Sequence, residues 1–194
     1  MGNRTSGAIR CLLMGLIVWI TVTKCNVPAL HFYMDDNFGY SYNSNLVHYA
    51  PYDQWHPPDQ VHLLHIWDQL GVPHSKHKQE AGKVLVIIGL LVDLHDLSIS
   101  MPQEKATHLT QLLHQFILLR KAPLHQWQSL LGHANWALNV FPLLKPALGS
   151  SYAKLVGKSL GNASIFLNKQ VKDHLSWFAD MVDSPANRLL LDPR

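Results

Sequence analysis

Apolar and polar positions follow different spacings in the two halves of the chain. Residues 6–23 are rich in apolar side chains and contain no proline, which predicts a buried helix, and Pro28 would end any such helix. Residues 29–34 and 38–42 then read as two strands, and Asp35, Asp36 and Asn37 between them favour a turn. The pattern predicts a β-hairpin with two adjacent carboxylates at its tip.

The middle of the chain repeats the order of helix and hairpin. Residues 43–56 are polar and aromatic and are expected to form a loop. A helix is predicted over residues 58–70, where Gly71 would stop it. After a polar connection, residues 84–93 are rich in β-branched side chains and predict one buried strand, with residues 97–101 returning as its hairpin partner.

From residue 102 onward the apolar positions take a helical spacing. Pro102 suits a first helical turn, Asn168 is placed to cap a later helix, and a shorter helix is expected around residues 147–156. The residues expected to face the core are Leu109, Leu112, Leu113, Phe116, Ile117, Trp127, Leu130, Leu131, Ala134, Leu138, Phe141, Val171, Leu175, Phe178, Ala179 and Val182. These patterns predict an α+β chain, with two β-hairpins and their helices followed by a helical bundle.

Composition allows a well-packed globular protein and says little about its partners. Hydrophobic residues make up 47% of the 194 residues and charged residues 15%, which is unlike a disordered chain. The formal net charge of +3 is compatible with nucleic acid but does not by itself indicate it. The two cysteines, Cys11 and Cys25, are expected to be free thiols in a reducing compartment. The thirteen histidines have no zinc-ligand spacing and are expected to be ordinary surface or core residues.

The N-terminal apolar segment has a second interpretation. Arg4 and Arg10 precede an apolar run over residues 11–22, as in a secretory signal or a membrane anchor. The run is short for a transmembrane helix, and no clear small-residue cleavage pattern follows it. An intracellular location, in the cytoplasm or the nucleus, is therefore expected, and attachment to a membrane is disfavoured.

Asp35 and Asp36 are the first candidate functional residues, because two adjacent ionised carboxylates repel each other. Near a protein surface that repulsion is on the order of several kcal/mol at about 4 Å. A magnesium ion would relieve it, and magnesium bound by one or two carboxylates, waters and phosphates serves phosphoryl transfer. A solvated Asp-Asp-Asn turn is the alternative interpretation. The aromatic and apolar residues 31–34 in front of the pair favour the metal site.

Tyr33-Met34-Asp35-Asp36 is the active-site signature of reverse transcriptases, and other segments resemble the same enzymes. GNRTS at residues 2–6 resembles the motif that leads into a helix of the polymerase palm, and LGVPHSKHKQ at residues 70–79 resembles the next palm motif. IIGLLVD and the following LSISMPQEK, within residues 87–105, resemble the hairpin that grips the primer and the start of the thumb. WQSLLGHANWALNVFPLLKPAL, at residues 127–148, resembles the thumb of DIRS-like (tyrosine-recombinase) retrotransposon polymerases of fungi.

The resemblance implies an RNA-directed DNA polymerase. Residues 1–101 would be a partial palm with two β-hairpins, and residues 102–194 a helical thumb and connection region. Asp35 and Asp36 would bind two magnesium ions, while Tyr33 and Met34 would flank the primer terminus and the incoming dNTP.

The resemblance also implies roles outside the acidic hairpin. Lys78 would steer or protonate the departing pyrophosphate, and Gly89 with its neighbours would form the primer grip. The helices over residues 102–141 would hold an RNA or DNA template–primer duplex through its backbone.

The chain departs from the family in its acidic residues. Reverse transcriptases carry a third metal-binding aspartate on an upstream palm strand, and here no acidic residue precedes Asp35. We therefore expect a fragment without its fingers and its ribonuclease H region, and no polymerase activity from this chain alone. Two alternatives remain: a non-enzymatic helical protein that binds nucleic acid or another protein, and a secreted or membrane-anchored protein that uses residues 11–22 as its signal.

Overall fold

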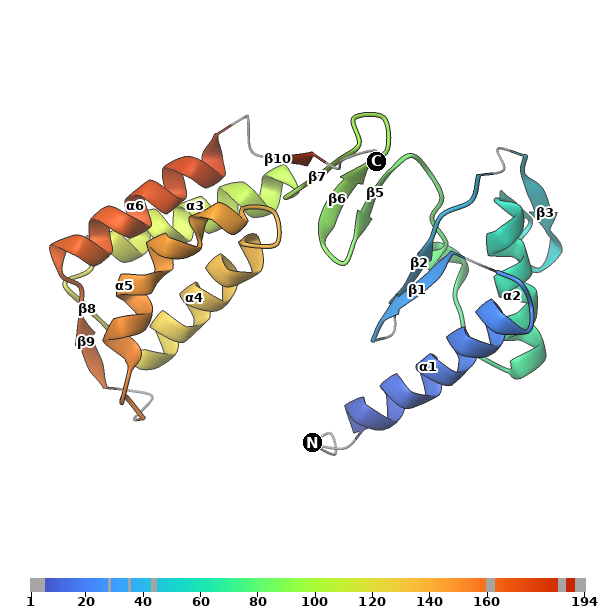
Figure 1. The fold of residues 1–194 in the computed structure, drawn as a ribbon, viewed down its shortest axis with the longest axis horizontal. Helices are drawn as coiled ribbons and strands as arrows, with labels where there is room; N and C mark the ends of the chain where they lie inside the picture. Colours follow the sequence, from blue (N-terminus) through green and yellow to red (C-terminus); the bar gives the residue numbers. More distant parts are fainter. Residues whose placement is uncertain are drawn as a thin grey trace. The chain divides into compact units, whose positions relative to one another are not determined.

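The chain forms two compact units, over residues 1–88 and 89–194, in a computed structural model (Figure 1). The structure describes residues 6–27, 29–34, 36–42, 45–159, 163–184 and 188–190. Each unit has a hydrophobic core of its own.

The first unit contains two long helices and several short strands. In chain order its elements are α1 (Ser6–Thr23), β1 (Leu30–Tyr33), β2 (Asp36–Gly39), β3 (Val47–Tyr49), η1 (Ala50–Tyr52), β4 (Gln54–His56), α2 (Pro58–Leu70), η2 (Lys76–Lys78) and β5 (Val84–Ile87). The predicted bounds of α1 and α2 are confirmed. For α2 the local reasons are visible, because Pro58 occupies the first turn and Gly71 ends the helix in the left-handed conformation.

The core of the first unit lies between α1, α2 and the two small antiparallel ribbons β1–β2 and β3–β4. Tyr49 and Leu64 are fully buried in it. The β3–β4 ribbon corrects the prediction of a loop over residues 43–56. Its pairing joins residues 47–49 to residues 54–56, so the polar and aromatic composition of this segment concealed a short hairpin.

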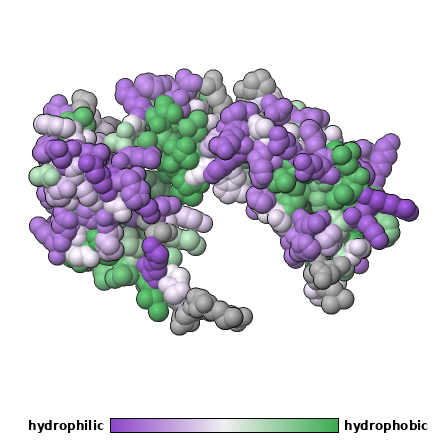
Figure 2. Space-filling model, turned by 180° about the vertical axis from the view of Figure 1, so that it is seen from behind, coloured by the Kyte–Doolittle hydropathy of each residue, from purple (hydrophilic) through white to green (hydrophobic). Residues whose placement is uncertain are grey.

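The prediction that α1 is a buried helix is wrong for most of its surface. Only Ile17, Val18 and Thr21 are buried. Its other face carries large apolar side chains that are 52–75% exposed: Ile9, Leu12, Leu13, Leu16 and Trp19. Figure 2 shows hydrophobic residues on the surface along α1. An apolar composition all round a helix does not say which of its faces the rest of the fold will cover.

α1 is also the one helix, among the described residues, that is long and apolar enough to cross a membrane. This property rests on length and composition, which a core helix and a signal sequence share. Cys11 and Cys25 in and after this helix are free thiols, as predicted.

The predicted strand over residues 84–93 is divided in two. β5 ends at Ile87 and β6 (Leu90–Asp93) begins three residues later, while Ile88 and Gly89 between them have φ angles of 50° and 79°. Positive φ at two central residues is the conformation of a type I′ turn. The β-branched composition of the run concealed this turn, and the boundary between the two units falls within it.

Among its described residues, the second unit contains the α-helices α3 to α6 beside short strands. Its elements are β6, β7 (Ser98–Ser100), α3 (Gln103–Leu118), β8 (Lys121–Pro123), α4 (Leu124–Ala137), η3 (Pro142–Leu144), α5 (Lys145–Leu155), β9 (Ser164–Phe166), α6 (Lys169–Asp183) and β10 (Arg188–Leu190). Within this unit β7 pairs with both β6 and β10, and β8 pairs with β9. The sequence prediction missed the β8–β9 ribbon and β10, because strands of three residues carry too little periodicity to detect.

The core of the second unit confirms most of the predicted helical stripes. Trp127, Leu175 and Phe178 are fully buried, and α3, α4, α5 and α6 all contribute side chains. Phe116 meets Trp127 edge to face, with ring centroids 5.0 Å apart. The predicted cap of α6 is also present, since the backbone N–H of Val171 donates to Asn168 Oδ1 at 3.1 Å. Three predicted core positions, Leu112, Ile117 and Leu138, are only partly buried.

Candidate functional site

The hairpin of β1 and β2 carries Tyr33, Met34 and Asp36 of the predicted site, and its strand pairing extends further toward the tip than predicted. Tyr33 pairs with Asp36, and Phe32 pairs with Asn37, so the strand pairing extends as far as Tyr33 and Asp36. Asp36 is therefore the first residue of β2 rather than part of the tip. Tyr33 and Met34 are more than half exposed, and Asp36 is also exposed. Asp35 lies outside the described residues.

The tightness of this hairpin has two visible causes. Met34 has a φ of 55°, a left-handed conformation that costs energy for a residue with a side chain and suits a two-residue turn. At the other end of the hairpin, a Cβ on Gly39 would lie 2.2 Å from the carbonyl oxygen of Ala29. Gly39 is thus required for the backbone approach that follows from its pairing with Leu30. Strain at a non-glycine residue is a common property of functional sites.

The described residues do not by themselves form a metal centre. No group of three histidine, cysteine, aspartate or glutamate side chains gathers anywhere in the described part of the chain. At the β1–β2 hairpin they supply one exposed carboxylate, that of Asp36. One carboxylate fits a magnesium ion held mainly by waters and phosphates, but it does not fit a two-metal centre.

Lys78 lies in the same unit, at the end of η2, and is exposed. The segment before it is fixed to α2 by a polar network that sequence analysis missed. Asp68 accepts a hydrogen bond from the Tyr49 hydroxyl at 2.6 Å and lies 3.0 Å from Nε2 of His74, whose Nδ1 is 2.5 Å from the Tyr52 hydroxyl. These contacts join α2, η1 and the segment before η2, so they limit where the exposed lysine can move.

The network shifts the acidity of its members. The hydrogen bond from Tyr49 holds the pKa of Asp68 below its usual value, and the contact with His74 acts in the same direction, while partial burial opposes both. Burial raises the pKa of Tyr49, and the neighbouring Asp68 raises it further. Asp68 is therefore the ionised acceptor of this network and Tyr49 its neutral donor.

Gly89 lies in the second unit, where its turn contacts the helices. A Cβ on Gly89 would lie 2.7 Å from Lys105 Nζ and 3.2 Å from Trp136 Cζ2. Lys105 donates a hydrogen bond to the Gly89 carbonyl oxygen at 3.3 Å and lies 5.2 Å from the centroid of the Trp136 ring. The positive φ of Gly89 favours glycine here, while the contact with the flexible end of Lys105 could be relieved by a small movement of that side chain.

A groove between α3 and α4 extends from these residues. Its volume is about 580 Å³, and it is lined by Met101, Lys105, His108, Leu109, Gln128, Ser129, Gly132, His133 and Trp136. The lining contains one lysine, two histidines, a glutamine and a serine, and no carboxylate. The surface thus combines the apolar side chains of Met101, Leu109 and Trp136 with one lysine and several hydrogen-bonding groups. The absence of a carboxylate from this lining suits a partner rich in acceptor oxygens.

The sequence contained a signal for this groove. Gln128, Ser129, Gly132, His133 and Trp136 recur at three- and four-residue spacing on one face of α4, separate from the buried stripe of Trp127, Leu130, Leu131 and Ala134. Nothing lies within 4 Å of the position that a Gly132 Cβ would take, so packing inside the chain does not require a glycine here.

The structure thus brings together some of the predicted site residues. Tyr33, Met34 and Asp36 share the β1–β2 hairpin, and Lys78 lies on a separate segment of the same unit. Gly89 belongs to the second unit, beside the α3–α4 groove.

These elements make an α+β fold, with an α+β part that carries a tight hairpin and a helical part that follows it. No family model matches the chain, and no curated protein matches its sequence. Among solved structures, the chain is similar to a foamy viral protease–reverse transcriptase that was solved in complex with double-stranded DNA. The similarity has a TM-score of 0.61 at 14% identity and covers 90% of this chain and 27% of that one. The chain therefore has a reverse-transcriptase-like fold and spans about a quarter of the length of that neighbour.

Proposed function

We propose that this chain is a palm-and-thumb part of a retroelement reverse transcriptase, and that its α3–α4 groove holds a template–primer duplex. The groove is the observation that supports the proposal. Lys105, Gln128 and Ser129 present donors there, and no lining residue would repel phosphate. The foamy viral neighbour was solved with double-stranded DNA, which is in line with this choice of partner.

Gly132 supplies a direct test of the groove. Glycine in a helix interior is unfavourable by about 1 kcal/mol relative to alanine, so Gly132→Ala should stabilise the protein by up to that amount. A duplex backbone packed against α4 would meet the new methyl group, and we expect duplex affinity to fall several-fold. Fluorescence anisotropy with a labelled duplex and a denaturant melt would measure the two effects.

Gly149→Ala is the matched control. Gly149 is an exposed glycine in α5, and a Cβ there would also have nothing within 4 Å. This variant should gain a similar stability and leave duplex affinity unchanged. Equal duplex affinities of the two variants would contradict the proposed groove, whatever their stabilities.

For the chemistry, the proposal assigns the roles that the family resemblance implies. Asp35 and Asp36 would hold magnesium, Tyr33 and Met34 would flank the primer terminus and dNTP, Lys78 would act on the pyrophosphate, and Gly89 would contribute to the primer grip. When bound, magnesium would supply charge stabilisation for nucleotidyl transfer. The relation to DIRS-like fungal elements is part of this proposal and rests on the thumb motif.

We expect this chain alone to bind duplex without extending it, because the described residues supply one carboxylate where the family uses three. A primer-extension assay with magnesium and dNTPs should give no product. Templated extension by the purified chain that Asp36→Asn abolishes would overturn this expectation.

A non-enzymatic nucleic-acid-binding protein is the second candidate. The observation that favours it is that every residue lining the groove belongs to the second unit, whereas the acidic hairpin belongs to the first. Duplex affinity that falls with salt and does not change with magnesium would support this candidate over a magnesium-dependent site.

A further inference from the structure

A second surface of the helical unit has the composition of a nucleic-acid contact. It lies where the β8–β9 ribbon meets the end of α5, at a hollow of about 250 Å³ lined by Lys154, Lys158, Ala163, Ser164, Ile165 and Phe166. None of these residues lines the α3–α4 groove. We use the name ribbon patch for Arg120, Lys121, Lys154, Lys158 and Phe166.

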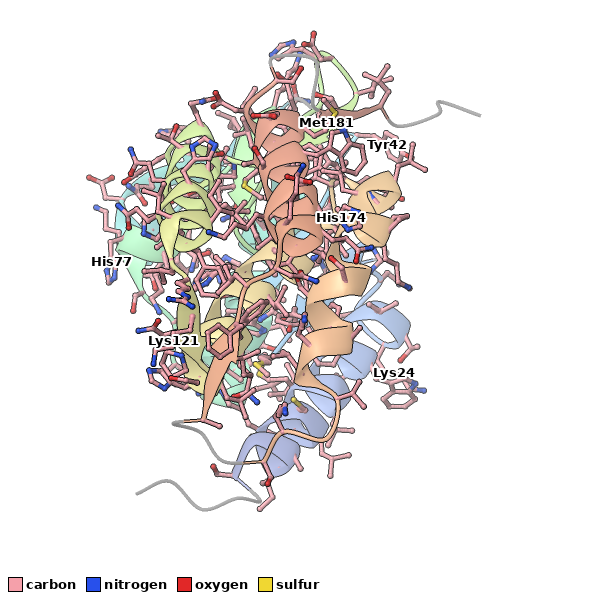
Figure 3. The ribbon with its side chains drawn as sticks, turned by 90° about the vertical axis from the view of Figure 1, so that its left-hand side faces the viewer. Lys24, Tyr42, His77, Lys121, His174 and Met181 are labelled. Carbon is pink, nitrogen blue, oxygen red and sulfur yellow. The ribbon has the colours of Figure 1, made fainter. Side chains whose placement is uncertain are left out.

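The ribbon patch is strongly basic. Lys121 and Phe166 are register partners in the ribbon, and Arg120 precedes Lys121 and accepts a backbone hydrogen bond from Leu167. Figure 3 looks onto this end of the unit and labels Lys121 beside the ribbon. Within the described residues, none of the four cations of the patch forms an ion pair with a carboxylate. Their charge is therefore available to an anionic ligand.

Phe166 adds an exposed aromatic ring among these cations. Its side chain is 57% exposed, and the guanidinium carbon of Arg120 lies 5.9 Å from the ring centroid. Phe166 thus presents an aromatic face to solvent beside the Arg120 guanidinium. The same combination is what unpaired bases need, because a base stacks on the ring while its phosphates meet lysine and arginine.

The size of the hollow limits the kind of ligand. Pockets for free small molecules usually enclose about 300–1,000 Å³, which is more than this hollow offers. One nucleotide of a longer strand needs less enclosure, since its neighbours are held by the surrounding charges. Stacking on Phe166 also requires a base that is not already paired and stacked in a duplex.

We infer that the ribbon patch binds single-stranded nucleic acid, with one base on Phe166 and the adjacent phosphates on Lys154, Lys158, Arg120 and Lys121. This adds a single-strand site to the proposed function as a nucleic-acid-binding part of a polymerase. It uses no residue of the α3–α4 groove, so the two proposals can fail separately.

The test uses the full chain and fluorescence anisotropy with two labelled strands of twelve nucleotides, oligothymidine and an abasic strand of equal length. Phe166→Ala should weaken oligothymidine binding by about fivefold or more, because loss of one stacked base has an effect of that order. Binding of the abasic strand should not change, since it offers phosphates without bases. Phe166→Tyr keeps the ring and should bind both strands as the unchanged protein does.

The lysines are tested by salt dependence. Each lost phosphate contact to a single strand reduces the slope of log affinity against log salt by about 0.7, so Lys154→Gln with Lys158→Gln should reduce it by about 1.4. Lys24→Gln, an exposed lysine of the first unit, is the matched control and should leave the slope unchanged.

Three results would overturn the inference. They are an unchanged affinity of Phe166→Ala for oligothymidine, an equal loss on both strands, or equal competition by polyglutamate, which would indicate a general site for acidic polymers. The Gly132→Ala experiment measures duplex binding at the groove alone. If the groove proposal fails there, the Phe166 measurements still decide whether the ribbon patch binds a single strand.

Discussion

His56 is a buried histidine that sequence analysis treated as ordinary. It is 4% exposed at the end of β4, and its Nε2 atom is buried without a hydrogen-bond partner among the described residues. Burial lowers the pKa of its imidazole, since the charged form would lose its hydration. The folded first unit therefore favours neutral His56.

This residue should make the first unit sensitive to acid. The folded pKa is below the unfolded value of about 6.5, so the unfolded state binds more protons over the window between them. Stability is fully present above about pH 6.5 and decreases as the pH falls below it. We expect the melting temperature of the first unit to fall between pH 7.5 and pH 5, and His56→Leu to reduce that fall.

Asp68 should not contribute to the change in stability between pH 7.5 and pH 5. Its pKa is lowered from the ordinary carboxyl range, so the stability that it contributes is lost only as the pH falls through that lower value. If the melting temperature of His56→Leu still falls by the full amount between pH 7.5 and pH 5, another group is responsible for the fall.

At the scale of elements, local signals predicted the long helices well and the short strands poorly. The bounds of α2 follow from Pro58 and Gly71, and those of α6 from Asn168. Residues 84–93 show the opposite case, because the composition of a buried strand concealed a turn at Ile88 and Gly89. The β8–β9 and β7–β10 pairings join segments distant in sequence, and local patterns cannot specify which partner is present.

The cap of α6 should be measurable. Asn168→Ala removes the acceptor for the Val171 N–H and should destabilise the second unit by about 1 kcal/mol. Asn168→Asp keeps an acceptor and should cost much less. Urea denaturation followed by tryptophan fluorescence would compare them, and equal losses would mean that the cap contributes nothing.

At the scale of the whole molecule, the main feature is the division into two units with separate hydrophobic cores. The first unit packs around Tyr49 and Leu64, and the second around Trp127, Leu175 and Phe178. The units meet in sequence at Ile88 and Gly89. The functional boundary predicted between residues 101 and 102 stays a prediction, as does the intracellular location.

Separate cores predict separate responses to core mutations. Leu64→Ala and Leu175→Ala each empty a fully buried site, which costs about 2–5 kcal/mol. Each variant should lose hydrogen-exchange protection mainly in its own unit. Equal loss throughout the chain from either variant would show that the two cores unfold together.

The candidate site was predictable only in part, for physical reasons. Tyr33, Met34, Asp36 and Lys78 could be named from short motifs because a motif keeps its residues together in sequence. The contacts of Gly89 with Lys105 and Trp136, and the ribbon patch, join residues far apart along the chain. Only folding brings such residues together.

By itself, the sequence determined the helices, the class of fold and the acidic hairpin, since periodicity, caps and turn residues act over a few neighbours. The tertiary structure decided that α1 leaves one apolar face exposed, that Asp36 pairs with Tyr33 at the start of β2, and that a groove without carboxylates opens between α3 and α4. Burial and register depend on which elements pack together, and no local pattern contains that information.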